Sequence, residues 1–121
     1  MHIPKLYLKG SFNGWGLDTP FTQTADNQWQ ATLSLTCDRH AFKIADQEGI
    51  EKWTMSADAT QATLIKLQAS QALISTLGIG NDLHFEATTT QRYTFTLNYK
   101  HSSFFLTLEI KNPRMERCLS G

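Results

Sequence analysis

YLKGSFNGWG, residues 7–16, is an apolar strand that stops abruptly at a turn. The strand ends on Gly10, and Asn13-Gly14 supplies residues that tolerate a positive φ angle and favour a turn. Trp15 therefore comes out on a loop, outside the alternating register of any strand. A loop indole needs an explanation, which is either a binding role or packing over the edge of the core.

Apolar and polar residues alternate along most of the chain. In residues 28–35, Trp29, Ala31, Leu33 and Leu35 share one face, and Gln, Thr and Ser fill the other, as is typical of a half-buried strand. Similar runs predict strands over residues 5–9, 40–45, 82–87, 92–99 and 104–110, with turn signals between them. Several short strands with one polar face predict an all-β, antiparallel sandwich.

The alternation also predicts which side chains form the core. The inward residues are Leu6, Leu8, Trp29, Ala31, Leu33, Leu35, Phe42, Ile44, Leu83, Phe85, Tyr93, Phe95, Leu97, Tyr99, Phe104, Leu106, Leu108 and Ile110. Lys43 lies between Phe42 and Ile44, so its side chain points away from the core.

Length and charge limit the classes of function. The chain has 121 residues, enough for one domain with its own core, and 11 basic residues balance 11 acidic ones. A neutral chain gives no electrostatic reason to expect nucleic acid or an anionic membrane surface as a partner. No apolar run approaches the roughly 20 residues of a membrane helix, and residues 1–5 lack the apolar region of a signal peptide. We expect a cytoplasmic protein, or a module of a larger secreted one.

Two regions depart from the strand pattern. Residues 57–77 lack clean alternation, and could form a short strand over 63–67 or a short helix over 68–77 that Gly78 would end. After Pro113 no alternation remains. The expected organisation is one sandwich over residues 1–112 and a loose tail over residues 113–121.

Cys37 and Cys118 are the only cysteines and lie far apart in the sequence, without a Cys-x-x-Cys motif. We expect two free thiols, with a disulfide only if the fold brings both residues close.

Four stretches resemble a known family. LYLKGSFNGW, residues 6–15, resembles the opening of the family 48 type of carbohydrate-binding module, the starch- and glycogen-binding sandwich of AMP-activated kinase β subunits and of pullulanase-, branching-enzyme- and amylase-associated modules. AFKIAD (residues 41–46) with the later Trp53, GIGNDL (78–83) and the hairpin beginning at Tyr93 extend the resemblance. The loop over residues 47–52 is longer than in the kinase subunits. The resemblance implies an immunoglobulin-like, early-set β-sandwich that binds α-glucans.

The resemblance also implies a set of site residues. Trp15 and Trp53 would lie flat against glucose rings, and Lys43 and Asn81 would hydrogen-bond sugar hydroxyls. These residue types suit a pyranose, which has an apolar face of C–H groups and a rim of hydroxyls. Taken alone, either loop indole is more readily explained as packing over the edge of the core than as a binding residue. Asn81, taken alone, is as readily a turn residue that bonds its own backbone.

The sequence shows no pattern typical of an enzyme. Glycoside hydrolysis needs two facing carboxylates, and nucleophilic catalysis needs a Ser or Cys with a His base; neither pattern is visible. The four histidines show no metal-ligand spacing. We therefore expect no enzyme, no cofactor and no metal. The open alternative is a docking domain for a catalytic or regulatory partner protein, with the indoles as hot spots.

Overall fold

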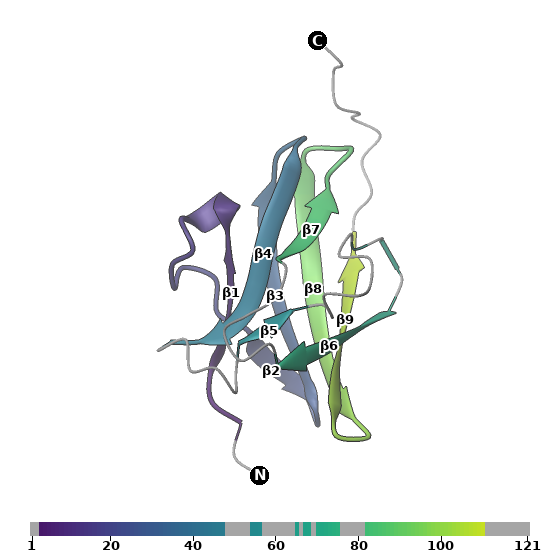
Figure 1. Ribbon diagram of the computed structural model, residues 1–121. Helices are drawn as coiled ribbons and strands as arrows, with labels where there is room; N and C mark the ends of the chain where they lie inside the picture. The colour runs from purple at the N-terminus through teal and green to yellow at the C-terminus, as the bar shows by residue number, and fades with distance from the viewer. Residues whose placement is uncertain are drawn as a thin grey trace.

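The computed structural model describes residues 3–47, 54–56, 65, 67–68, 70–75 and 82–110. Nine strands and one 3₁₀ helix lie in these residues, and the strands form the two antiparallel sheets of a β-sandwich (Figure 1). The strands are β1 (Leu6–Gly10), β2 (Thr22–Ala25), β3 (Gln28–Leu35), β4 (Arg39–Asp46), β5 (Met55–Ser56), β6 (Ser70–Ser75), β7 (Leu83–Glu86), β8 (Gln91–Lys100) and β9 (Ser103–Glu109), and the 3₁₀ helix is η1 (Ser11–Asn13). The predicted fold class is confirmed.

The two sheets differ in how they are built. Sheet 1 is centred on β4, which pairs with β1 along one edge and, along the other, with β7 over residues 39–42 and with β5 at Ile44. Sheet 2 has the strand order β2-β3-β8-β9-β6. Because β6 pairs with both β5 and β9, the two sheets are joined along this side.

The core lies between the sheets. Phe42 of sheet 1 and Phe95 of sheet 2 are both fully buried and meet edge to face, with ring centroids 5.3 Å apart and an interplanar angle of 82°. Phe85 and Tyr93 make a second such contact across the sandwich, at 5.1 Å. These aromatic pairs add to the burial energy of the aliphatic side chains around them. The inward faces predicted from alternation are confirmed for every one of these strands.

Trp29 occupies its predicted face but not the centre of the core. It is only partly buried, and its ring lies 6.0 Å from that of Phe104, which also contacts Tyr99. The neighbouring strand β2 is exposed at all four residues, so this edge of the sandwich stays open. Trp29 therefore packs against the core on its predicted face, but at the margin, where it is less buried than a residue at the centre.

The helix considered for residues 68–77 is also wrong over β6. This strand pairs with β9 and places Leu73 in the core, opposite Phe104. Pairing with the edge of β9 outweighs the helix propensity of Ala, Gln and Leu, because propensity is a weak preference that tertiary contacts override. Of the alternative strand over residues 63–67, only two residues are described: Ile65 is buried, and Leu67 forms a bridge to Leu108.

Cys37 lies in the turn between β3 and β4 and is disulfide-bonded, so the expectation of a free thiol at this position is wrong. Cys118 and the predicted tail, residues 113–121, lie outside the described residues. Within the described part of the chain, no helix has the length and apolar character needed to cross a membrane.

The marginal position of Trp29 predicts a graded loss of stability. Trp29→Ala should lower the free energy of unfolding by about 2 kcal/mol, below the ~3–5 kcal/mol typical of a fully buried aromatic residue. Phe95→Ala, at the centre of the core, should lower the free energy of unfolding by the full ~3–5 kcal/mol. Urea unfolding of both variants measures the difference, and equal losses would place Trp29 in the core proper.

Candidate functional site

The turn that follows β1 is held together by one side chain. Asn13 accepts the Gly10 N–H at its Oδ1 (3.0 Å) and donates from Nδ2 to the Leu8 carbonyl (2.8 Å) and the Thr19 hydroxyl (3.2 Å). Gly14 then adopts a φ of 64°, in the left-handed region that glycine enters without steric cost. The predicted Asn13-Gly14 turn is confirmed, and Asn13 is the residue that fixes it.

Gly10 allows this turn to lie close to the sheet. A Cβ atom at this position would come 2.7 Å from the Ala41 carbonyl oxygen and 2.5 Å from the ring of Phe12. Any larger residue would therefore push Phe12 and η1 away from β4.

Trp15 lies at the end of this turn in an unusual backbone conformation. Its N–H donates to the Gly10 carbonyl (2.9 Å), and its φ of 60° places a bulky residue in the left-handed region, at a cost of roughly 1–2 kcal/mol. The side chain is 43% exposed. Strained backbone at an exposed aromatic residue is typical of a binding position rather than of a packing one.

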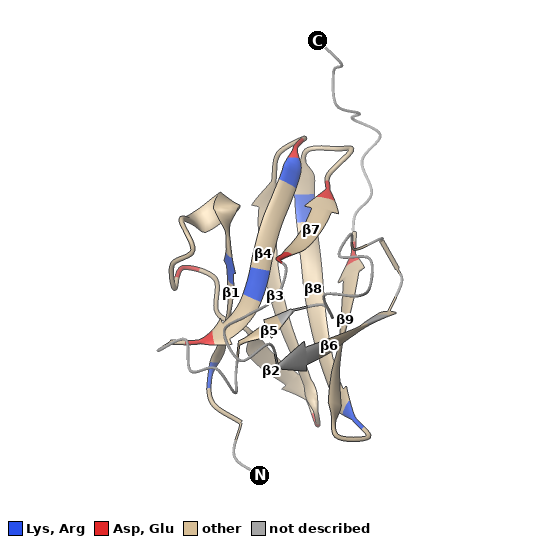
Figure 2. Ribbon diagram, in the orientation of Figure 1, with Lys and Arg blue, Asp and Glu red and all other residues tan. Residues whose placement is uncertain are grey.

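Lys43 lies on the outer face of sheet 1, as predicted. It is directly opposite Lys9 in the pairing of β1 with β4, and Figure 2 shows basic residues of these two strands side by side. Like charges opposite one another are unfavourable, but the Lys43 Nζ also lies 3.5 Å from the Asp82 Oδ1. Lys9, Lys43 and Asp82 thus form a row across β1, β4 and the residue before β7, with the carboxylate of Asp82 at one end.

The rest of this outer face was not found from the sequence. Tyr7, opposite Ala45, and His84, opposite Ala41, share the face with Lys9 and Lys43 and are partly exposed. The alternation that turns Leu6 and Leu8 inward could have identified Tyr7 and Lys9, because alternate residues of a strand face opposite sides. Lys43 lies between Ala41 and Ala45 on this face, and its side chain keeps 22% of its surface exposed.

Trp53 and Asn81 lie outside the described residues. The described residues that follow them lie beside β4: Met55 pairs with Ile44, and Asp82 contacts Lys43.

Comparisons with known proteins give a fold and no family. The sequence matches no family model and no curated protein. One solved structure is similar. It is described as the ligand-induced structure of AmyP-SBD, a starch-binding domain, and aligns with a TM-score of 0.62 and 15% identity over 85% of this chain and 70% of that chain. At this identity the likeness shows a shared β-sandwich.

The described residues offer no metal centre, since no three His, Cys, Asp or Glu side chains among them lie close enough to hold an ion. The groups that this site presents are an indole, two ammonium groups, a carboxylate, a phenol and an imidazole.

The role of Asn13 can be tested directly. Asn13→Ala removes three hydrogen bonds from a partly buried turn, and should lower the free energy of unfolding by about 1–3 kcal/mol. Asn98→Ala, on the outer face of β8, should change it by less than about 0.5 kcal/mol. Thermal or urea unfolding distinguishes the two, and a neutral Asn13→Ala would mean that the turn does not depend on this side chain.

Proposed function

We propose that this chain binds α-glucans such as starch or glycogen without turning them over, on the outer face of sheet 1 and the loop that carries Trp15. The observation that carries the proposal is the exposed indole of Trp15, whose strained backbone is bonded to Gly10 at the end of β1. Lys9, the residue before Gly10, begins the row that continues through Lys43 to Asp82. The choice of α-glucans is supported by the resemblance of the four sequence stretches and by the shared fold of a starch-binding domain.

The chemistry of this face suits a sugar chain. A glucose ring that covers roughly 60 Å² of an indole gains about 1.5 kcal/mol at ~25 cal/mol/Å². Lys43 donates and Asp82 accepts hydrogen bonds, so a pair of neighbouring sugar hydroxyls could be satisfied by the two together. A carboxylate beside the lysine also makes the face unsuitable for a purely anionic ligand.

We extend the site to Trp53 and Asn81, the other two residues implied by the resemblance. Their sequence neighbours Met55 and Asp82 lie beside β4, which supports this extension. Two stacked rings and two net hydrogen bonds of about 1 kcal/mol each give a gross interaction near 5 kcal/mol. The resulting Kd is on the order of 0.1–1 mM, so avidity on a polymer would supply further affinity.

Native gels that contain polysaccharide test the proposed ligand class. Migration should slow with amylopectin or glycogen and stay unchanged with xylan or a cellulose derivative. Retardation by all of these polymers, or by none, would contradict the proposal. Release of reducing sugar from starch by the purified chain would contradict binding without turnover.

Trp15→Ala should weaken amylopectin binding by about 5- to 30-fold, the value of one stacked ring, while the melting temperature stays within a few degrees. Leu17→Ala is the matched control, because Leu17 is in the same loop and is 40% exposed. It should leave the affinity unchanged. If the two substitutions weaken amylopectin binding equally, binding depends on the loop as a whole and not on the indole of Trp15. Trp15→Ala combined with Trp53→Ala should abolish detectable binding.

Lys43→Gln should weaken binding by about 5- to 100-fold, since it removes a charge-assisted hydrogen bond of about 1–3 kcal/mol. The free energy of unfolding should fall by no more than about 1 kcal/mol, because the Asp82 side chain of this ion pair keeps 36% of its surface in solvent. Lys5→Gln, at an exposed position before β1, controls for the loss of charge. If both lysine variants bind equally well, Lys43 is not in the site.

A further inference from the structure

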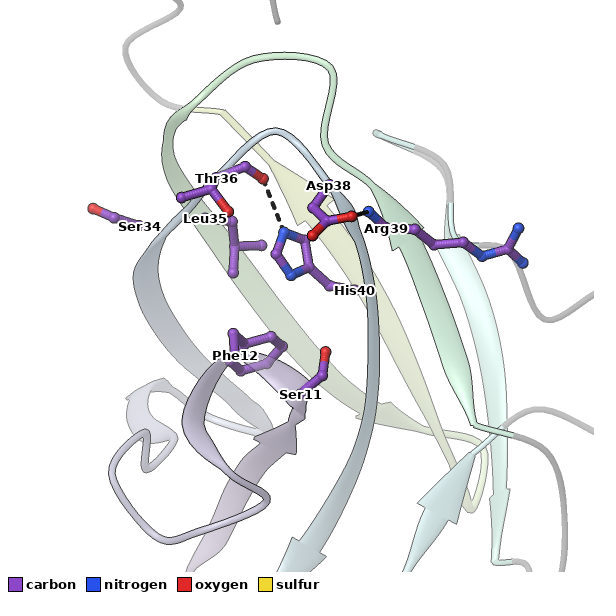
Figure 3. A pocket seen from close by; sticks show the side chains of 8 residues that line it. All are labelled: Ser11, Phe12, Ser34, Leu35, Thr36, Asp38, Arg39 and His40. Atoms are coloured by element: carbon purple, nitrogen blue, oxygen red, sulfur yellow. Dashed lines mark hydrogen bonds between the residues drawn. The ribbon is translucent and has the colours of Figure 1, made fainter. Parts of the chain in front are cut away.

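A pocket of about 400 Å³ lies between η1 and the turn that joins β3 to β4, apart from the row of Lys9, Lys43 and Asp82 (Figure 3). Neither the sequence patterns nor the resemblance points to it. Its walls bring together residues about 30 positions apart in the sequence. Five of the residues that line it are Ser11, Phe12, Asp38, Arg39 and His40.

His40 is the deepest polar group of this pocket. It lies in phase with Phe42 on the inner face of β4 and is only 7% exposed. One ring nitrogen, Nε2, lies 2.9 Å from the Thr36 carbonyl oxygen. A carbonyl can only accept, so Nε2 carries a proton and Nδ1 of the neutral imidazole is an acceptor. Figure 3 shows that second nitrogen pointing away from Thr36, toward Phe12 and Ser11.

The groups around His40 complement it. The ring of Phe12 meets the imidazole edge to face, with centroids 6.0 Å apart, and is partly exposed, so it offers an apolar wall. The Ser11 hydroxyl accepts the Ala41 N–H at 3.2 Å, which leaves its own proton free to be donated. Asp38 accepts the Arg39 N–H with one carboxylate oxygen (2.8 Å) and keeps acceptor capacity on the other.

This set of groups selects among ligand classes. The Asp38 carboxylate opposes an anion, and in Figure 3 the Arg39 guanidinium points away from the pocket. A wholly apolar ligand would cover the second His40 nitrogen without offering it a donor, which is unfavourable. A neutral ring with several hydroxyls and one apolar face satisfies the imidazole, the carboxylate and the hydroxyl together, while its C–H face lies on Phe12.

We infer that this pocket is a second sugar site, which takes a single hexopyranose ring with His40 and Asp38 as acceptors, Ser11 as donor and Phe12 as the apolar wall. The volume is near the lower end of ligand pockets, ~300–1,000 Å³, so one ring fits and a long chain does not. The ring is either a free monosaccharide or the end of a glucan chain. The inference concerns different residues from the proposed glucan face and can hold if that proposal fails.

Two-dimensional ¹H–¹⁵N spectra of the whole chain test this inference, with glucose and maltoheptaose as probes. Glucose should shift the backbone amides of Ser11, Phe12 and residues 38–40 in a saturable way, with a Kd on the order of 10 mM. The same shifts should persist in Trp15→Ala. If maltoheptaose shifts these amides but glucose does not, the pocket takes chain ends. The reverse result identifies a free monosaccharide.

His40→Phe keeps an aromatic ring against Phe12 and removes the acceptor, so the affinity for the sugar should fall about tenfold. Asp38→Asn, at an exposed position, should lower the affinity for the sugar by a smaller factor. It serves as the second test if the His40→Phe variant does not fold. His101→Asn is the control, because His101 is exposed in the β8–β9 turn with a φ of 53° that Asn tolerates.

Three results would overturn the inference. The first is an absence of shifts with either sugar at about 100 mM, which is tenfold above the expected Kd. The second is the loss of these shifts in Trp15→Ala, and the third is an unchanged affinity for the sugar in both His40→Phe and Asp38→Asn. Loss of gel retardation in Trp15→Ala with the pocket shifts retained would support both sites separately.

Discussion

Phe42 and Phe95 meet edge to face between the two sheets, and this contact determines to which side each residue of β4 points. It fixes the register of β4 against sheet 2, since both rings are fully buried and reach each other from opposite sheets. A strand places successive side chains on opposite faces, so with Phe42 inward, Lys43 must point out. A slip of one residue would exchange the two and bury an ammonium group. The same packing that forms the core therefore places the polar row of the candidate site.

The aromatic part of the site depends on a different, local device. Gly10 lets η1 approach β4, and Asn13 ties the turn back to Leu8 and Gly10. The chain then leaves this turn with Trp15 in a left-handed backbone and its indole in solvent. The strained and exposed residue is stable because its neighbours are fixed, as is common where a site is preorganised. The turn that presents Trp15 also forms one wall of the pocket around Phe12 and His40.

Sequence reasoning succeeded where a local pattern determines the structure. Period-two alternation located β1, β3, β4, β7, β8 and β9 and their inward faces, and Asn13-Gly14 located the turn. The short strands β2 and β5 were not predicted. Sequence reasoning failed for β6, because Ala, Gln and Leu carry no strand signal there and pairing with β9 decides the outcome. It overestimated the burial of Trp29, because alternation gives the face of a strand but not whether another layer covers that position. It missed the pocket because the walls come from η1 and the β3–β4 turn, which only the tertiary fold brings together.

The central claim is that the fold separates a core-packing indole from a ligand-binding one. The most direct measurement is a titration of ¹⁵N-labelled protein with maltoheptaose, following the indole N–H signals of its three tryptophans. The signal of Trp15 should shift in a saturable way, together with the backbone amides of Tyr7 and Lys9, while that of Trp29 stays in place. A saturable shift of Trp29 with no change at Trp15 would contradict the account, and so would the absence of any shift at all three indoles.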